Sequence, residues 1–132
     1  MPSPEHEAMV QTFLDQPIAE APSLQAQRDN YEALLAGFPI DPNAKIESFK
    51  IEHIDADWVS MPDSRADQAV LYLHGGGYVI GSNTGYREFA SRVAACTGAR
   101  VCVLDYRLAP EHPFPAALDD AVMAYQLSLI HI

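Results

Sequence analysis

Ala69-Val70-Leu71-Tyr72-Leu73 leads directly into His74-Gly75-Gly76-Gly77-Tyr78, and no other stretch of the chain is as specialised. The apolar run has no polar alternation, which is typical of a strand buried on both faces of a sheet. Consecutive glycines cost backbone entropy, so a sequence that keeps them usually needs conformations that other residues avoid. Backbone N–H groups turned toward one point can stabilise the negative charge that develops in acyl transfer. The stretch therefore predicts a buried strand that ends in a candidate oxyanion turn.

The residues after the glycines complete a strand–helix–strand unit. Apolar residues between Tyr86 and Thr97 follow helical spacing, and Gly98 is a typical stop signal. The run Val101-Cys102-Val103-Leu104 then predicts a second buried strand. Because parallel strands need a crossover of about this length, the pattern predicts an α/β fold in which these two strands are parallel.

Prolines dominate the segment that follows. Pro110, Pro113 and Pro115 each fix their own φ and restrict the preceding residue, so we expect an extended segment. Pro115 also suits the first turn of a further helix. We expect the inner face of that helix to consist of Leu118, Val122 and Tyr125.

The N-terminal part of the chain predicts two helices and then two strands. Ser3 and Ser23 are suitable N-cap residues, and Pro4 suits the first helical position. Strands are expected over residues 45–54 and 58–61, with a turn between them at 53–57. The apolar faces of the helices are expected to be Met9, Val10, Phe13 and Leu14 in the first, and Leu24, Tyr31, Leu34, Leu35 and Phe38 in the second.

Composition and charge argue against several classes of partner. The net charge is −10 and the pI is about 4.6, which disfavours nucleic acid and anionic membrane surfaces. The first residues have neither a basic start nor a long apolar run, so we expect no signal peptide and a cytoplasmic location. No segment approaches the roughly 20 apolar residues of a membrane span. Cys96 and Cys102 are too few for a disulfide framework and are expected to be buried free thiols.

Three interpretations of the glycine turn compete. A phosphate cradle fits poorly, because the dinucleotide fingerprint would need glycine at Ile80 and a P-loop would need lysine at Ser82. A strand-to-helix turn without any chemistry is the second interpretation. The third is the oxyanion loop of an α/β-hydrolase, which follows a strand and supplies N–H donors to the site.

Two segments resemble signature sequences of the bacterial hormone-sensitive-lipase-like esterases, family IV of the bacterial lipolytic enzymes. They are YLHGGGYVIGS at residues 72–82 and DYRLAPEHPFPAALDDA at residues 105–121. The likeness covers roughly residues 45–126 and implies the N-terminal part of an α/β-hydrolase fold, with a mixed, mostly parallel sheet and flanking helices. It further implies N-terminal cap helices in residues 1–40 and the N-terminal half of the hydrolase core in 41–126. Residues 127–132 depart from the family's usual helix, and we interpret them as a non-native tail.

The resemblance also implies roles for individual residues. Gly75, Gly76 and Gly77 would form the oxyanion turn, with the N–H groups of Gly76 and Gly77 directed at the site. His74 would shape the turn, and Tyr78 would line the substrate pocket together with the cap helices. The implied activity is hydrolysis of small or medium carboxylic esters or lactones by a Ser-His-Asp triad, without metal or cofactor. The implied partners are a small-molecule ester and, for a full-length protein, a second copy in a homodimer.

The nucleophile of that triad is missing from this sequence. It belongs in a G-x-S-x-G turn, and none of the serines lies in that frame. His112 is expected to be structural, and Asp119 and Asp120 are expected to support the neighbouring loop by pairing with Arg107. We therefore expect an N-terminal fragment that hydrolyses no ester alone and that aggregates through an open strand edge. The alternative is a non-catalytic hydrolase-fold protein that binds a small ligand at the glycine turn.

Overall fold

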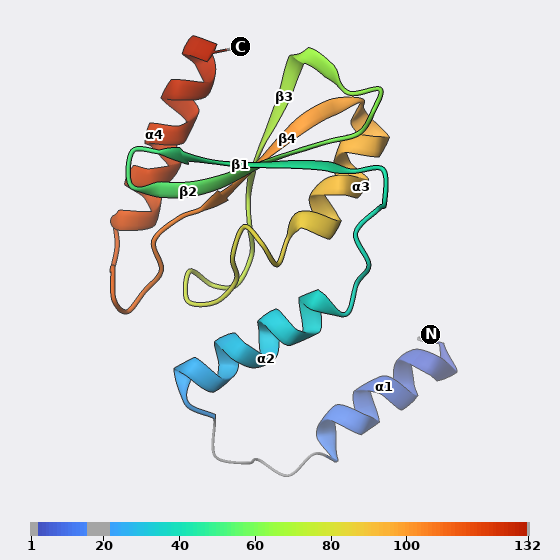
Figure 1. Cartoon of the computed structure of the whole chain (residues 1–132). Helices are drawn as coiled ribbons and strands as arrows, with labels where there is room; N and C mark the ends of the chain where they lie inside the picture. Colours follow the sequence, from blue (N-terminus) through green and yellow to red (C-terminus); the bar gives the residue numbers. More distant parts are fainter. Residues whose placement is uncertain (1–2, 16–21, 132) are drawn as a thin grey trace.

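A four-stranded mixed sheet with strand order β1-β2-β4-β3 forms the centre of the structure (Figure 1). The computed structural model describes residues 3–15 and 22–131. β2 pairs antiparallel with both β1 and β4, whereas β3 and β4 are parallel. This arrangement confirms the predicted α/β class and the parallel strand–helix–strand unit. The strands are β1 (Lys45–Ile51), β2 (Ile54–Ser60), β3 (Arg65–Leu73) and β4 (Ala99–Asp105), and the helices are α1 (Pro4–Leu14), α2 (Leu24–Ala36), α3 (Arg87–Thr97) and α4 (Ala116–His131).

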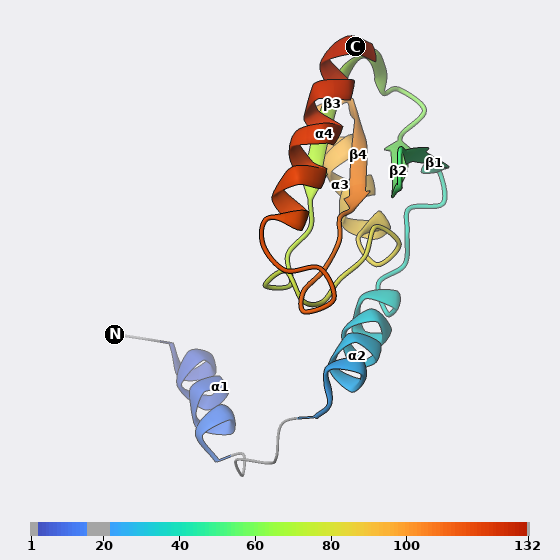
Figure 2. The same ribbon diagram turned by 90° about the vertical axis from the view of Figure 1, so that its left-hand side faces the viewer.

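β4 is the buried strand of the sheet, and its two faces pack against different helices (Figure 2). Val101 and Val103 pack in one hydrophobic cluster with Ala90 and Ala94 of α3, and the alternate residues of β4 pack in a second cluster with α4. This division follows from the alternation of side chains along a strand. Burial of Cys102, on the α4 side, raises the pKa of its thiol to about 12. Cys96 is also free, but it is exposed, so the prediction of two buried thiols is wrong for Cys96.

The prediction that β3 is buried on both faces is wrong. β3 is an edge strand of the described sheet, and none of its residues is fully buried. Leu73, its last residue, is 47% exposed. The apolar run of β3 resembles that of β4 in sequence, but of these two strands only β4 has a neighbouring strand on each side.

The turn between β1 and β2 is also shorter than predicted. It consists of Glu52 and His53 alone, and Glu52 adopts a left-handed conformation with φ 54°. Asp55 and Asp57 are typical turn residues in sequence, yet both lie within β2. Asp57 is fully buried and accepts a hydrogen bond from Arg87 of α3 at 2.8 Å, which explains why a strand tolerates it there.

α4 begins directly after Pro115 as predicted, but it presents a different face to the sheet. Leu118, Val122 and Tyr125, the predicted inner face, are 53%, 46% and 55% exposed. Asp120 and Ala124 are buried in their place. The ion pair between Asp120 and Arg107 accounts for this rotation of the helix, because a buried carboxylate needs its partner.

The segments on either side of α4 differ in how well they were predicted. Residues 109–112 and 114–115 lie in turns or a bend rather than in an extended segment, and the N–H of His112 donates to the carbonyl of Leu108 at 2.9 Å. Prolines therefore fix local conformations here without straightening the chain. At the other end, α4 continues without a break to His131, and Leu127 packs against the core. A non-native tail at 127–132 stays a prediction, and Ile132 lies outside the described residues.

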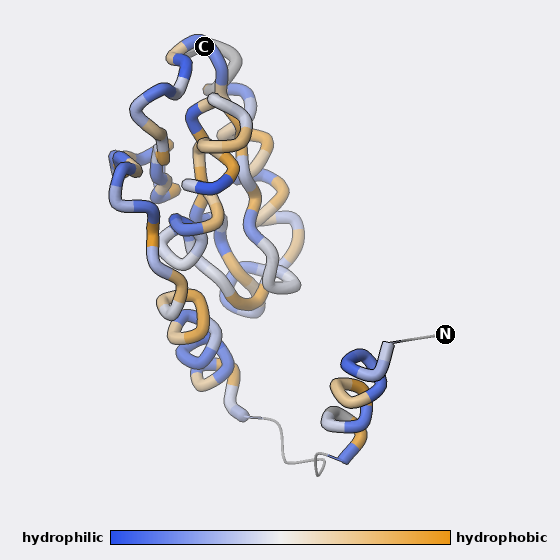
Figure 3. The backbone as a smooth tube through the Cα atoms, turned by 90° about the vertical axis from the view of Figure 1, so that its right-hand side faces the viewer, coloured by the Kyte–Doolittle hydropathy of each residue, from blue (hydrophilic) through white to orange (hydrophobic). Residues whose placement is uncertain are grey.

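The two N-terminal helices begin at the predicted N-caps. The hydroxyls of Ser3 and Ser23 accept hydrogen bonds from backbone N–H groups at 3.3 and 3.2 Å. α2 lies beside the loops at one end of the sheet, whereas α1 lies apart from it and carries both hydrophilic and hydrophobic residues (Figure 3). None of the helices in the described ranges has the length and apolar character that crossing a bilayer needs. Met9, Val10 and Leu14 are 55%, 40% and 71% exposed, and the Phe13 side chain lies outside the described residues.

Candidate active site

The glycine turn reverses the chain directly after β3. Gly76 and Gly77 have φ angles of 127° and 60°, and Tyr78, although not glycine, has φ 64°. The N–H groups of Val79 and Ile80 both donate to the Gly76 carbonyl at 3.1 Å, which closes the turn. A Cβ atom on Gly76 would lie 2.0 Å from the Ile80 carbonyl oxygen. Position 76 therefore accepts only glycine, both for its φ angle and for its space.

His74 lies beneath the turn and is only 4% exposed. Its ring stacks against the rings of Tyr86 and Tyr106, with centroids 5.5 and 4.3 Å away. Burial lowers the pKa of the His74 imidazole, which favours the neutral ring, and a protonated Nδ1 then donates to the Gly75 carbonyl at 2.9 Å. The Tyr106 hydroxyl donates to the His74 carbonyl at 2.6 Å. These contacts are those of a residue that supports the turn from within.

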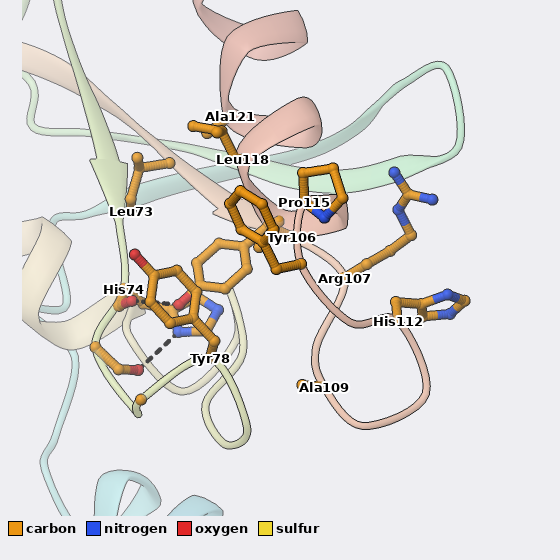
Figure 4. Close-up of a pocket in the computed structure, with 14 residues that line it drawn as sticks. Leu73, His74, Tyr78, Tyr106, Arg107, Ala109, His112, Pro115, Leu118 and Ala121 are labelled. Atoms are coloured by element: carbon orange, nitrogen blue, oxygen red, sulfur yellow. Dashed lines mark hydrogen bonds between the residues drawn. The ribbon is translucent and has the colours of Figure 1, made fainter.

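The turn opens onto a pocket of about 610 Å³ between the end of β3 and the start of α4 (Figure 4). Gly75, Gly77 and Tyr78 form part of one side, whereas Gly76 does not line the pocket. The Tyr78 side chain is 65% exposed, and its ring lies 6.1 Å from that of Tyr106. Apolar side chains from the other side include Phe114 and Leu118. An apolar pocket beside a strained turn suits a ligand with a hydrocarbon part and one polar atom.

Arg107 lines the same pocket, but its guanidinium is bound to Asp120. The Asp120 carboxylate accepts from the Arg107 backbone N–H at 2.9 Å and from its Nη2 at 2.7 Å. Burial alone would raise the pKa of Asp120. The hydrogen bonds from Arg107 and His53 lower it by more than burial raises it, so the pKa is lowered overall. The predicted pairing with Arg107 is thus confirmed for Asp120, whereas Asp119 is exposed. His112 is exposed and lines the pocket, so its structural role stays a prediction.

One face of α2 carries the polar residues Arg28, Tyr31 and Glu32, which contact the loops around the pocket. The sequence analysis did not predict these contacts. Arg28 donates from Nε to the Val79 carbonyl at 2.8 Å and from Nη2 to the Ala109 carbonyl at 3.0 Å. The same guanidinium forms a bidentate pair with Glu111, with both contacts at 2.8 Å. The signal available in the sequence was the helical spacing of the polar residues on this face. Two further contacts from it join Tyr31 to Tyr86 at 2.6 Å and Glu32 to Ser82 at 2.9 Å.

A buried carboxylate holds the loop that follows the turn. Asp57 accepts from the Asn83 side chain at 3.0 Å and also binds Arg87 and Ser48. The Asn83 backbone N–H donates to Asp105 at 3.1 Å, and burial raises the pKa of that carboxyl. Across residues 3–15 and 22–131, no group of three or more histidine, cysteine or acidic side chains is arranged to hold a metal ion. Asp57 and Asp105 thus both hold Asn83, and with it the loop that follows the turn.

Comparisons with known proteins agree on one family. The alpha/beta hydrolase fold family matches residues 70–131. An acetyl-hydrolase of Streptomyces hygroscopicus is 44% identical over 79 residues, which are 60% of this chain and 26% of that protein. An esterase of Acinetobacter venetianus is 31% identical over 105 residues, which are 80% of this chain and 34% of that protein.

Solved structures extend the likeness to nearly the whole chain. The crystal structure of an esterase from the bacterial hormone-sensitive lipase family superposes with a TM-score of 0.82 at 40% identity, and the match covers 99% of this chain and 44% of that one. The crystal structure of EstE5, soaked with p-nitrophenyl butyrate, superposes with a TM-score of 0.83 at 36% identity, and the match covers 98% of this chain and 44% of that one. The chain thus spans less than half the length of the proteins that it matches.

Proposed function

Because this chain belongs to the bacterial hormone-sensitive-lipase-like family of α/β hydrolases, we propose that its glycine turn is the oxyanion-stabilising part of a carboxylic ester hydrolase. The observation that carries the proposal is the turn itself: Gly76 and Gly77 have positive φ angles, and Gly75 and Gly77 line an apolar pocket. Only backbone groups can act there without a side chain blocking the approach of a carbonyl oxygen. The substrates are small or medium carboxylic esters or lactones.

The proposed reaction is acyl transfer through a serine. Its hydroxyl oxygen attacks the ester carbonyl carbon, and the carbonyl oxygen becomes the oxyanion that the N–H groups of Gly76 and Gly77 stabilise. A general base takes the serine proton during the attack and gives it to the leaving alcohol when the intermediate collapses. Water then adds to the acyl-enzyme, which releases the acid and restores the serine hydroxyl. No serine of these 132 residues lies in a G-x-S-x-G frame, so none of them is the proposed nucleophile. The apolar pocket wall, including Phe114 and Leu118, would hold the hydrocarbon part of the substrate.

A chimera tests this proposal. Residues 1–126 would replace the matching part of the solved esterase that is 40% identical, which supplies the remainder of the fold. We expect the chimera to hydrolyse p-nitrophenyl butyrate. Weakening an oxyanion donor typically lowers kcat by about 10²- to 10³-fold, so Gly76→Ala in the chimera should fall by a factor in that range.

Gly98→Ala is the matched control, because Gly98 also has a positive φ angle, 68°, but follows α3, away from the turn. It should leave kcat within about twofold, since it disturbs no group that meets the substrate. A chimera that melts cooperatively and binds the ester without cutting it would contradict the proposal. That result would favour the alternative of a non-catalytic small-ligand binder.

A further inference from the structure

Among the side chains of α2 that the structure describes, only Arg28 forms hydrogen bonds to both loops around the pocket. Its side chain is 20% exposed, so the guanidinium is largely enclosed between the helix and the two loops. Two of its donors are directed at backbone carbonyls rather than at a side chain. A surface ion pair with Glu111 alone would need neither of these bonds. The geometry therefore points to a role in fixing the backbone.

The two carbonyls belong to opposite sides of the pocket. Val79 directly follows Tyr78, which lines the pocket from the glycine turn, and Ala109 lines it from the loop after β4. Two direct bonds join these sides: the Ala109 N–H donates to the Tyr78 carbonyl at 2.8 Å, and the Tyr106 hydroxyl donates to the His74 carbonyl at 2.6 Å. Arg28 adds a further connection near the Tyr78–Ala109 bond, since its Nε and Nη2 each bind one side.

The backbone at this point needs external support. Tyr78 has a left-handed φ angle that non-glycine residues adopt at a cost. The carbonyls of Tyr78 and Val79 are both bound, by Ala109 and Arg28 respectively. Release of Arg28 would leave the left-handed segment held by the Ala109 bond and by the internal bonds of the turn.

We propose that Arg28 is a positioning residue for the oxyanion turn: by bridging the Val79 and Ala109 carbonyls, it holds the two sides of the pocket at a fixed separation. Docking of α2 then sets the geometry of the turn, and undocking of α2 loosens both sides together. The assigned role rests on the proposed function of the turn, but the contacts that carry it do not. The planar guanidinium suits this role because it presents several donors in a fixed geometry, which a lysine ammonium does not.

Hydrogen–deuterium exchange on this chain tests the proposal without any hydrolysis assay. The reporters are the N–H groups of Val79, Ile80 and Ala109, which close the turn and join it to the other loop. Arg28→Ala should raise exchange about tenfold in peptides that cover residues 74–82 and 106–112, the change expected for loss of a charge-assisted hydrogen bond. Peptides from β4 should not change. If the chimera fails to hydrolyse the ester, the exchange result still tests the role of Arg28. If exchange does not change, the proposed function of the turn is still tested by the chimera.

Three further samples separate the bridge from other roles of the side chain. Arg28→Lys keeps the charge but loses the fork, so it should raise the same exchange by about threefold, and it also serves if Arg28→Ala fails to fold. Glu111→Gln leaves both carbonyl bonds in place and should change exchange less than Arg28→Lys does. Arg92→Ala, which removes the ion pair of the exposed Arg92 with Glu88 on α3, is the control and should change nothing at these peptides.

Addition of millimolar methylguanidinium to Arg28→Ala should slow exchange again at residues 74–82, because the free ion can occupy the vacated donor position. Three outcomes would overturn the proposal. Exchange at residues 74–82 could be unchanged in Arg28→Ala, or it could rise equally in Glu111→Gln. Exchange could also rise throughout the chain, β4 included, without rescue by methylguanidinium.

Discussion

Gly76→Ala is the change that the structure penalises most clearly. The φ angle of 127° at this position is a conformation that costs a non-glycine residue about 1–3 kcal/mol. The added Cβ would also lie 2.0 Å from the Ile80 carbonyl oxygen and 2.7 Å from its carbon, and both are backbone atoms that cannot rotate away. Relief of this clash requires the turn to open.

Opening the turn has a second cost. The N–H groups of Val79 and Ile80 both donate to the Gly76 carbonyl, and each bond contributes about 1 kcal/mol. Together with the backbone strain, Gly76→Ala should lower the free energy of unfolding by about 3–5 kcal/mol. That is a large fraction of the roughly 5–15 kcal/mol that stabilises an ordinary domain.

Urea unfolding followed by tryptophan fluorescence measures this loss, because Trp58 in β2 is the one tryptophan of the chain and packs against Phe49. Gly98→Ala provides the comparison. Its φ angle is 68° and nothing lies within 4 Å of the added Cβ, so it should cost only about 1–2 kcal/mol of backbone strain. Equal losses in the two variants would refute the reasoning, since the clash with Ile80 would then contribute nothing.

Three other predictions concern the chain as a whole. The pure chain should hydrolyse p-nitrophenyl butyrate no faster than buffer does, because it carries no serine in a nucleophile turn; turnover above the buffer rate would contradict this. Asp105→Asn should stabilise the chain at neutral pH. Burial raises the pKa of Asp105 in the folded chain above its ordinary 3.8. The folded state therefore loses stability as the pH rises through this raised pKa and the buried carboxyl ionises. Asparagine cannot ionise, so the variant avoids that loss. Urea unfolding should show the advantage at pH 7 and its disappearance well below 3.8, and an advantage of equal size at both pH values would disprove the electrostatic cause. Finally, the free edge of β3 and the exposed side of α4 should make the chain self-associate, and Val122→Lys should increase the monomer fraction in size-exclusion chromatography. A wild-type chain that elutes as a single monomer peak would rule this out.

Local sequence patterns predicted the elements of the fold better than their surroundings. The apolar run Val101–Leu104 correctly predicted a buried strand. The similar run in β3 predicted burial on both faces, but no residue of β3 is fully buried. An apolar run reports that a strand is suited to burial, whereas its neighbours in the sheet decide how much surface is covered. The same limit applies to α4, where the apolar spacing favoured Leu118 and Val122 as the inner face. The buried pair of Asp120 with Arg107 decided the rotation instead.

In the candidate site, too, local features were predicted from the sequence and long-range contacts were not. The glycine turn, His74 and Tyr78 were found because they are contiguous, and a turn of this kind is specified by its own residues. Arg28 and Asp57 were missed because their partners are distant in sequence: Arg28 and Val79 are 51 positions apart, and Asp57 and Asn83 are 26 apart. A lone arginine on a helix or an aspartate near a turn carries no local mark of such a contact. Only the packed fold brings these groups to the loops that they support.

The supports of the turn approach it from different directions, and this arrangement has a physical reason. A left-handed segment gains little from its own side chains, so its conformation persists only when surrounding groups determine it. His74 fills the space beneath the turn, Arg28 binds its outer carbonyl from α2, and Asp57 holds the following loop through Asn83. Each support comes from a different element, so the geometry of the turn depends on the docking of α2 and on the sheet together. An oxyanion site requires such rigidity, because N–H donors stabilise a developing charge only when they are already in place.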